Sequence, residues 1–416
     1  MYRKEAALPN FSNLALGGAG TQSMDTEDDG GIMTNAADDN FMRSGNGVYP
    51  CNPEVTLHRL HDNANILCCS LSPDDVILAT GGADGKLALS TWGAACDEST
   101  AKRVVESATT LQCSAPVITV AFSGSYSMKC VAAGCMDGSV HVAAYELVTG
   151  KGLVLKAVTK IPIKHDKYCK KVAWNSNSAA PMTPPLLATA SADGTIKLHQ
   201  VSVGTEYTTE DETTSIQLKT REMLNFEGGG VEAMCFVKDE LCCYVRGKPY
   251  LNCFDTSKDD LAPRKINLNH GGRPVAAGTT LEDQHVSFAV MDMAPSPPGI
   301  ASSSNSEYLA LATDVSRNII LDFATGLQVR NLYGHQNDAF SNPKLAWSSN
   351  GQYLIGNTQE DSSLCVWDIS SAKIVQRIQG EGGHVQTIRD MFASSSTDML
   401  VTTSFDKQTK LWFAPS

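Results

Sequence analysis

A chain of 416 residues is longer than one ordinary compact core, so it predicts either two domains or a repeat architecture. Apolar residues make up 42% of the chain and charged residues 19%, a balance typical of globular proteins. The formal net charge of −12 argues against nucleic acid or an anionic membrane as a direct ligand. No apolar run approaches the ~18 residues of a membrane span.

The N-terminus does not read as a secretory signal, because Arg3 and Lys4 are followed by Glu5 and no apolar core comes after them. The chain has 13 cysteines, an odd number, and no Cys-x-x-Cys motif. Pairs such as Cys68-Cys69 lie within apolar runs, where a free thiol behaves as a small hydrophobic group. We therefore expect reduced thiols and a location in the cytoplasm, the nucleus or both.

Residues 1–50 differ in composition from the rest of the chain. They are rich in Gly, Asn, Asp and Ser and contain the acidic run Asp25–Asp29. Because this segment has few apolar side chains, their burial cannot offset the entropy that the segment would lose on ordering. We therefore expect a flexible, disordered tail. The apolar patch Leu8–Leu16 leaves open a short docking motif within it.

From Pro53 onward, short apolar runs alternate with turn residues, which is typical of an all-β repeat fold. Each of the first three units has two apolar runs, an Asp-Gly turn and a third run. The turns are Asp84-Gly85, Asp137-Gly138 and Asp193-Gly194. Asp-Gly between such runs is a strong hairpin signal because both residues tolerate a positive φ.

The fourth and fifth units are less regular, with turns at Gly247-Lys248 and Arg317-Asn318. We expect the fifth unit to begin with a strand over Val286–Val290. The sixth and seventh units each open with a Gly-His pair and carry an Asp six residues before a Trp. In the seventh unit, the first strand is expected to begin at Val385.

The two ends of the repeat region suggest how the fold closes. The sequence reaches Ser416 shortly after the third strand of the seventh unit, which therefore lacks a fourth strand. Val55–Leu60, just before the first unit, is a spare strand that could complete it. Such pairing would leave no open edge in a ring of sheets.

The Gly-His pair, the turn Asp and the third-strand Trp of units six and seven resemble the WD40 repeat. The resemblance extends over residues 53–416 and implies an all-β, seven-bladed WD40 β-propeller whose N-terminal strand closes the last blade. The disordered tail would precede it.

In that family, a His at the start of the unit, a Ser or Thr, the turn Asp and the Trp form a structural hydrogen-bond network. Carried over to this sequence, the network residues are His165, Asp193, His335, Asp361, Trp367, His384, Asp406 and Trp412. In the seventh unit the hydroxyl would come from Thr402 or Ser404. Repetition of the set around the ring favours a structural role over a catalytic triad, which a chain would build once.

No motif indicates an enzyme or a cofactor. The sequence has no G-x-S-x-G, no phosphate-binding G-x-x-x-x-G-K-[ST] and no H-E-x-x-H. His58 and His61 with Cys68 and Cys69 could be drawn as a metal site, but alternation along a strand turns them in different directions. We therefore predict no catalytic, metal or cofactor site.

Three places on the loop face are candidates for binding a partner. The segment Lys167, Tyr168, Lys170 and Lys171 is basic and aromatic, which suits an acidic partner segment. Asp338 and Phe340 lie in a long loop of the sixth unit, and Phe405 precedes a turn Asp. An aromatic side chain on a rigid scaffold is a frequent anchor for a partner.

The resemblance implies a non-enzymatic interaction scaffold, a subunit or adaptor of an intracellular multiprotein complex that binds other proteins or peptide segments. The alternative is a peptide-recognition adaptor of the histone-tail or ubiquitin-ligase substrate-receptor type. An acidic ring at the channel mouth would favour the histone-tail reading. Ser370 stands where many ubiquitin-ligase receptors have Arg after Trp-Asp, which weakens the receptor reading.

Overall fold

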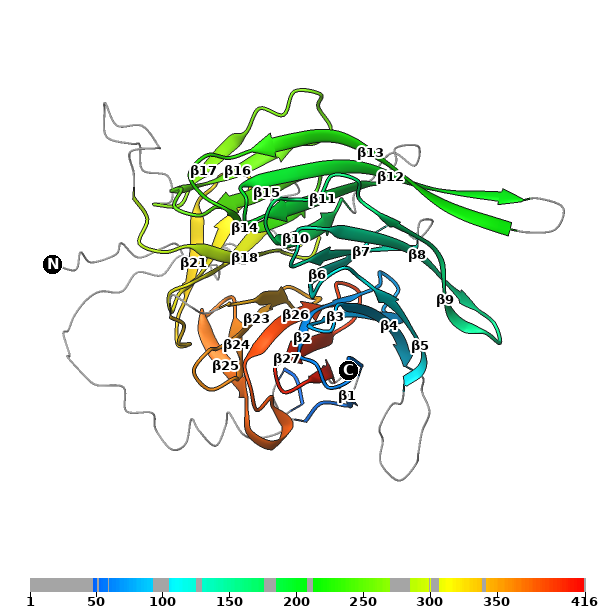
Figure 1. Cartoon of the computed structure of the whole chain (residues 1–416). Coiled ribbons are helices and arrows are strands. Elements are labelled where there is room, and N and C mark those ends of the chain that lie inside the picture. The colour runs from blue at the N-terminus through cyan, green and yellow to red at the C-terminus, as the bar shows by residue number, and fades with distance from the viewer. Residues whose placement is uncertain are drawn as a thin grey trace, which may run out of the picture.

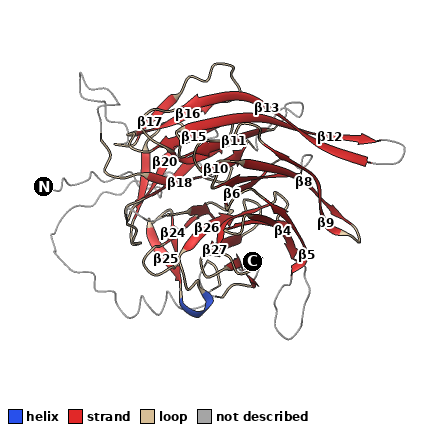
Figure 2. Cartoon of the chain, in the orientation of Figure 1, coloured by secondary structure: helices blue, strands red, loops and turns tan. Residues whose placement is uncertain are grey.

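The computed structural model describes residues 48–50, 52–58, 60–92, 105–124, 129–175, 185–207, 212–269, 285–298, 300, 307–338 and 342–414. Across these ranges the secondary structure is almost entirely β (Figure 2), the one helical element being the short 3-10 turn η2 (Gly380–Gly382). In the same ranges no helix has the length and apolar character needed to cross a membrane. Residues 1–47 of the predicted tail lie outside them.

The described strands form seven antiparallel sheets of four strands each, which we number as blades one to seven in chain order. Blades one to four are β2 (Ile66–Leu71), β3 (Ile77–Gly82), β4 (Lys86–Trp92), β5 (Val105–Gln112); β6 (Val117–Phe122), β7 (Cys130–Cys135), β8 (Val140–Val148), β9 (Gly152–Lys160); β10 (Cys169–Trp174), β11 (Leu186–Ser191), β12 (Thr195–Tyr207), β13 (Glu212–Asn225); and β14 (Val231–Val237), β15 (Glu240–Val245), β16 (Tyr250–Asp255), β17 (Arg264–Asn267). Blades five to seven are β18 (Val290–Pro295), β19 (Tyr308–Thr313), β20 (Asn318–Asp322), β21 (Gln328–Leu332); β22 (Leu345–Trp347), β23 (Tyr353–Asn357), β24 (Leu364–Asp368), β25 (Lys373–Ile378); and β26 (Ile388–Ala393), β27 (Met399–Ser404), β28 (Gln408–Phe413), β1 (Val55–His58).

The blades close into a ring. The first strand of each blade contacts the first strand of the next, from β2 through β6, β10, β14, β18 and β22 to β26, which returns to β2. Figure 1 shows the red strands of blade seven beside the blue strands of blade one. The seven-bladed all-β propeller predicted from the sequence is confirmed.

Blade seven is assembled from both ends of the repeat region. Its outermost strand is β1, which pairs antiparallel with β28 and places Val55 opposite Leu411 and Leu57 opposite Thr409. The predicted closing strand is therefore confirmed. It leaves the ring without an open seam, because the strand that begins the propeller hydrogen-bonds to the strand that ends it.

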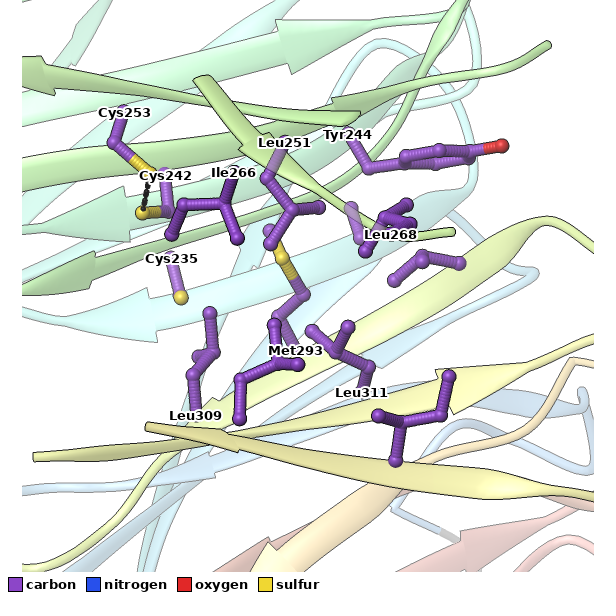
Figure 3. Close-up of a cluster of buried hydrophobic side chains, with 14 of the residues drawn as sticks. Cys235, Cys242, Tyr244, Leu251, Cys253, Ile266, Leu268, Met293, Leu309 and Leu311 are labelled. Carbon is purple, nitrogen blue, oxygen red and sulfur yellow. Dashed lines mark hydrogen bonds between the residues drawn. The ribbon is translucent and has the colours of Figure 1, made fainter. Parts of the chain in front are cut away.

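Apolar side chains fill the interfaces between successive blades. Seven buried clusters lie one at each interface around the ring. The second strands β3, β7, β11, β19 and β27 are buried at every position, since each lies inside its sheet and between two neighbouring sheets. Figure 3 shows the interface of blades four and five, where Cys235, Cys242 and Cys253 pack among leucines.

The described cysteines are free and buried, as expected for small apolar groups in a reduced protein. The tight turns also follow the prediction. Gly138 has a φ of +83°, and a side chain there would collide with the carbonyl oxygen of His165. Glycine is required at such a turn because it lacks a Cβ.

Two predicted strand starts are wrong. In blade five, Val286 and Phe288 are buried but precede β18, which begins only at Val290. In blade seven, Val385 is 78% exposed, and β26 begins at Ile388. In both blades the apolar residues before the strand belong to the connection from the preceding blade, and hydrophobic pattern alone does not separate such a segment from a strand.

The end of the predicted tail packs against the propeller. Tyr49 is 1% exposed and lies in the apolar cluster between blades six and seven. Its backbone N–H donates to Gln376 Oε1 at 3.0 Å, and Gln376 Nε2 donates to its carbonyl oxygen at 2.5 Å. The described propeller contacts therefore begin at least four residues before the predicted boundary at residue 53.

Candidate functional site at the channel mouth

A repeated backbone irregularity directs side chains toward the axis of the ring. In six of the seven first strands the pairing register shifts by one residue at the start of the strand, as in a β-bulge. A bulge leaves one residue unpaired and re-aims its side chain. The six bulged residues are Leu67, Ile118, Lys170, Glu232, Met291 and Arg389.

All six bulged residues line one cavity of about 390 Å³, to which every blade contributes. Because the first strands surround the axis, this cavity is the mouth of the central channel, and we call it the channel mouth. Its remaining lining residues are Met136, Tyr168, Lys171, Asp292, Asn342, Lys344, Asp390 and Phe405. Blade six has no bulge in β22 and contributes Asn342 and Lys344 from the segment just before that strand.

A chain of ion pairs connects residues of the channel mouth that come from different blades. Asp292 of blade five lies 3.3 Å from Lys171 Nζ and 3.8 Å from Lys344 Nζ, and Lys344 lies 3.6 Å from Asp390. Burial would raise the pKa of Asp292, but the two lysines outweigh burial and lower it. Asp292 in turn raises the pKa of Lys171. Asp292 and Lys171 therefore stay charged together at neutral pH.

The third carboxylate of the mouth, Glu232, is also paired. Lys170 Nζ lies 2.6 Å from it, and Arg246 Nε donates to it at 2.7 Å. Burial would raise the pKa of Glu232, but the hydrogen bond from Arg246 and the charge of Lys170 lower it. Each carboxylate that lines the mouth thus has a cationic partner within 4 Å.

Arg389 differs from the other cations of the mouth. Its guanidinium lies 5.0 Å from the centre of the Phe405 ring, and its Nε is buried with no hydrogen-bond partner among the described residues. No carboxylate among the described residues forms an ion pair with Arg389. Burial lowers its pKa, although the pKa of arginine starts so high that it stays charged. Arg389 is therefore a half-buried cation with a hydrogen-bond donor, Nε, that no described residue satisfies.

The structure brings four of the seven predicted binding residues together. Tyr168, Lys170, Lys171 and Phe405 line the mouth, and Lys170 lies 5.9 Å above the Tyr168 ring. Lys167 and Asp338 are exposed and do not line it, and Phe340 lies outside the described residues. Sequence reasoning missed Glu232, Asp292, Lys344, Arg389 and Asp390. The available signal was their place at or near the start of each unit's first strand.

In blades three and seven the His, hydroxyl and Asp of the predicted network are linked by hydrogen bonds, whereas Nε1 of Trp412 has no partner among the described residues. His384 is hydrogen-bonded to Asp406 at 2.8 Å and to Thr402 at 2.7 Å, so Thr402 and not Ser404 supplies the hydroxyl. His165 is hydrogen-bonded to Thr189 at 2.9 Å and to Thr195 at 2.7 Å. Thr195 links His165 to the turn Asp, because the Thr195 hydroxyl donates a hydrogen bond to Asp193.

Blade one has the same network, which the sequence reading missed. His61 is hydrogen-bonded to Asp84 at 3.0 Å and to Thr80 at 2.9 Å. From the sequence, His61 is considered only as a metal ligand. Its spacing of 23 residues from Asp84 resembles the 22 residues between His384 and Asp406 and was the available signal.

Blade six departs from the expected network. Both ring nitrogens of His335 are buried without a hydrogen-bond partner in the described structure, and its ring meets Trp367 edge to face at 5.1 Å. Asp361 is instead bonded to Thr358 and Ser363 and lies 3.5 Å from Arg377. The predicted His335–Asp361 contact is absent, because other side chains occupy the carboxylate of Asp361.

Replacing His335 with Phe is expected to leave stability at pH 7 unchanged or higher and to flatten its decline in acid. Burial lowers the pKa of His335 to about 4, below its value of 6.5 in the unfolded chain. Between these pH values the unfolded chain binds a proton that the folded chain does not, so stability falls as pH falls. One such group lowers the free energy of unfolding by about 1.4 kcal/mol for each unit that the pH falls between these two pKa values.

Urea denaturation at pH 7 and at pH 4.5 measures this effect. His384→Phe is the matched control, because it removes hydrogen bonds to Asp406 and Thr402 and should destabilise the protein at pH 7. An acid decline as steep in His335→Phe as in the unmodified protein would contradict the interpretation of His335.

The comparison with known families agrees with this architecture. The family model described as "WD domain, G-beta repeat" matches residues 53–89 and 326–368. The first match covers β1 and most of the first three strands of blade one, and the second ends at Asp368, the last residue of β24 in blade six. Together with the seven four-stranded sheets closed into a ring, these matches identify WD40 repeats in the chain and support its assignment to the WD40-repeat family.

Proposed function

We propose that the chain is a non-enzymatic interaction protein, a scaffold or adaptor subunit of an intracellular multiprotein complex, that binds an acidic segment of a partner at the channel mouth. WD40 propellers typically serve as protein-interaction scaffolds that bind proteins or peptides. The observation that carries the finer proposal is the guanidinium of Arg389: its buried Nε has no hydrogen-bond partner among the described residues, and it lies in a cavity whose carboxylates are already paired.

The charge of the mouth supports an acidic ligand. Four cations line it, namely Lys170, Lys171, Lys344 and Arg389, against three carboxylates, so the lining has a net positive charge on a chain of net charge −12. A carboxylate of the partner could form a bidentate pair with Arg389, which is the strongest hydrogen-bonded geometry between side chains. The pair would be partly shielded from water and therefore less screened by salt than an exposed pair.

Apolar and aromatic side chains surround that charge. Phe405 lies under Arg389, Tyr168 lies under Lys170, and Met136 is 55% exposed at the rim. Aromatic and Arg anchors within a cavity are typical of the residues that contribute most to protein-protein affinity. The mouth therefore suits a short partner segment with an acidic residue flanked by apolar ones.

The alternative, a reader of basic peptides such as histone tails, is less favoured. A basic peptide would need free carboxylates, yet Glu232, Asp292 and Asp390 each lie within 4 Å of a lysine or arginine. Displacing such a partner leaves a buried cation uncompensated, which is costly. The ubiquitin-ligase receptor type remains an alternative context in which an acidic segment could be recognised.

Fluorescence anisotropy with labelled peptides of equal length tests the proposal. One peptide alternates Glu with Leu, one alternates Lys with Leu, and one alternates Ser with Leu. We expect the Glu peptide to bind most tightly and Arg389→Ala to weaken its binding at least about tenfold, the equivalent of ~1.4 kcal/mol. Lys167→Ala is the matched control, because Lys167 is a cation of the same segment as Lys170 outside the mouth.

Equal affinity for the three peptides, or equal losses in Arg389→Ala and Lys167→Ala, would overturn the proposal. Tighter binding of the Lys peptide would favour the alternative reader of basic segments. Circular dichroism and urea denaturation of each variant verify that the loss of binding is not a loss of folding.

A further inference from the structure

Blade two contains a cluster of side chains that the proposed function does not use. One sulfur each of Cys113 and Cys135 and one ring nitrogen of His141 lie within 4.8 Å of one another, and all three side chains are buried. Among the residues that the structure describes, this is the one group that contains a cysteine and brings three possible metal-ligating side chains within 4.8 Å of one another.

The fold holds the three residues on rigid backbone. Cys135 ends β7 and His141 lies on β8, across a tight turn in which the N–H of Cys135 donates to Ser139 O at 2.9 Å. Cys113 directly follows β5 of blade one, and its N–H donates to Gly85 O at 2.8 Å. Groups placed on secondary structure in this way need little rearrangement to bind a ligand together.

Blade two has lost the network that blades one, three and seven keep. The hydroxyl four residues before the turn Asp comes from Thr80, Thr189 and Thr402 in those blades. Ala133 stands at this position in blade two, opposite His141. Ser114 stands 23 residues before Asp137, where blade one has His61 before Asp84.

Two equivalent positions of blade two carry residue types that can ligate a metal. Cys135 stands two residues before the turn Asp, where Ser191 and Ser404 of the other blades hydrogen-bond to backbone carbonyls. His141 stands four residues after the turn Asp, at the place of Lys197 and Lys410, which donate to carbonyls of the connecting loops. Blade two therefore has a thiol where blades three and seven have a serine, and an imidazole where they have a lysine. A second thiol, that of Cys113, lies beside both.

Cys113 and Cys135 also pack among the apolar side chains between blades one and two, but they differ from the other close thiol pair in having a histidine beside them. Cys242 and Cys253 show what a structural thiol pair looks like in this protein: their sulfurs are 2.7 Å apart among leucines, with no histidine among the cluster residues (Figure 3). His141, in contrast, has Ser114 Oγ 3.4 Å from its Nε2, a long contact for a buried imidazole.

We propose that Cys113, Cys135 and His141 bind a zinc ion that joins blade one to the turn of blade two. Thiolate and imidazole ligands together suit Zn²⁺, which takes them at about 2.3 and 2.0–2.1 Å in a tetrahedron. Ligand atoms of such a tetrahedron are separated by about 3.5 Å, so the cluster needs to contract by no more than about 1.3 Å. Ser114 Oγ, which lies 3.4 Å from His141 Nε2, could fill the fourth position or hold a water there.

One further observation concerns the turn between β7 and β8. Met136, which lines the channel mouth, lies between Cys135 and Asp137. A bound ion would therefore also fix the turn that carries one wall of the mouth.

The zinc content of the full-length protein, purified without chelators, tests this inference together with a Co²⁺ titration of the metal-stripped protein. We expect one zinc per chain and, with Co²⁺, a thiolate charge-transfer band and the visible bands of a tetrahedral ion. Cys113→Ser and His141→Ala should each weaken Co²⁺ binding at least about 100-fold, given three protein ligands. Cys242→Ser, which alters the other thiol pair, should keep both signals unchanged.

Melting curves with and without zinc separate a lost site from a lost fold. Zinc should raise the melting temperature of the unmodified protein and of Cys242→Ser, and should not raise that of Cys113→Ser. Absence of stoichiometric metal and of the charge-transfer band would overturn the proposal. So would an intact mass showing a Cys113–Cys135 disulfide in place of bound metal.

Discussion

Replacing Trp412 with Ala is expected to lower the free energy of unfolding by about 3–5 kcal/mol. Trp412 has no exposed surface and lies in the apolar cluster between blades six and seven, against Ile355 and Leu400. Its strand, β28, also pairs with β1, the contact that closes the ring. A cavity at this place weakens both the interface and the closure, so urea denaturation should show the loss as a lower midpoint.

The same residue type in blade six provides a sharp comparison. Trp367 is equally buried, but its Nε1 donates to Tyr333 O at 2.8 Å, whereas Nε1 of Trp412 has no partner among the described residues. Trp→Phe removes the indole N–H in both. We expect it to cost about 1 kcal/mol more at Trp367, where it breaks a hydrogen bond. A larger loss at Trp412 would show that its environment has been misread.

Replacing Asp292 with Ala is expected to destabilise the protein by about 3–5 kcal/mol, because Lys171 and Lys344 are left in the channel without their shared carboxylate. Asp292 also accepts a hydrogen bond from the backbone N–H of Leu345 at 3.3 Å. Asp292→Asn keeps an acceptor of the same shape and removes only the charge. It therefore measures the electrostatic share of the loss in the same urea experiment.

Asp259→Ala is the matched exposed control. Asp259 lies 3.9 Å from Arg221, but its side chain is fully exposed, so its removal should change stability little. Comparable losses in Asp292→Ala and Asp259→Ala would contradict the view that the ion pairs inside the channel stabilise the ring.

The local parts of the fold could be predicted from the sequence. Asp-Gly turns such as Asp137-Gly138 demand positive φ, and the alternating runs beside them specify hairpins. The closing strand β1 could be predicted because a ring of sheets leaves no strand unpaired. The start of β18 could not be predicted, because Val286 and Phe288 are apolar and buried although they precede the strand.

The channel mouth is harder to predict, since it is made by single residues from seven units. Lys170 and Tyr168 were found because they form a local basic and aromatic segment. Arg389 gave no such signal: its position becomes meaningful only when the bulge in β26 directs it to the axis beside Phe405. The partner of Asp361 likewise depended on which neighbouring hydroxyls reach it, and a motif does not contain that information.

The most direct test of the proposed channel mouth is a reversal of its charge. We would measure the binding of the Glu and Lys peptides to the unmodified protein and to Arg389→Glu by fluorescence anisotropy at two salt concentrations. We expect the variant to lose at least about 100-fold in affinity for the Glu peptide and to gain affinity for the Lys peptide. Unchanged preference for the Glu peptide in a folded Arg389→Glu protein would contradict the account.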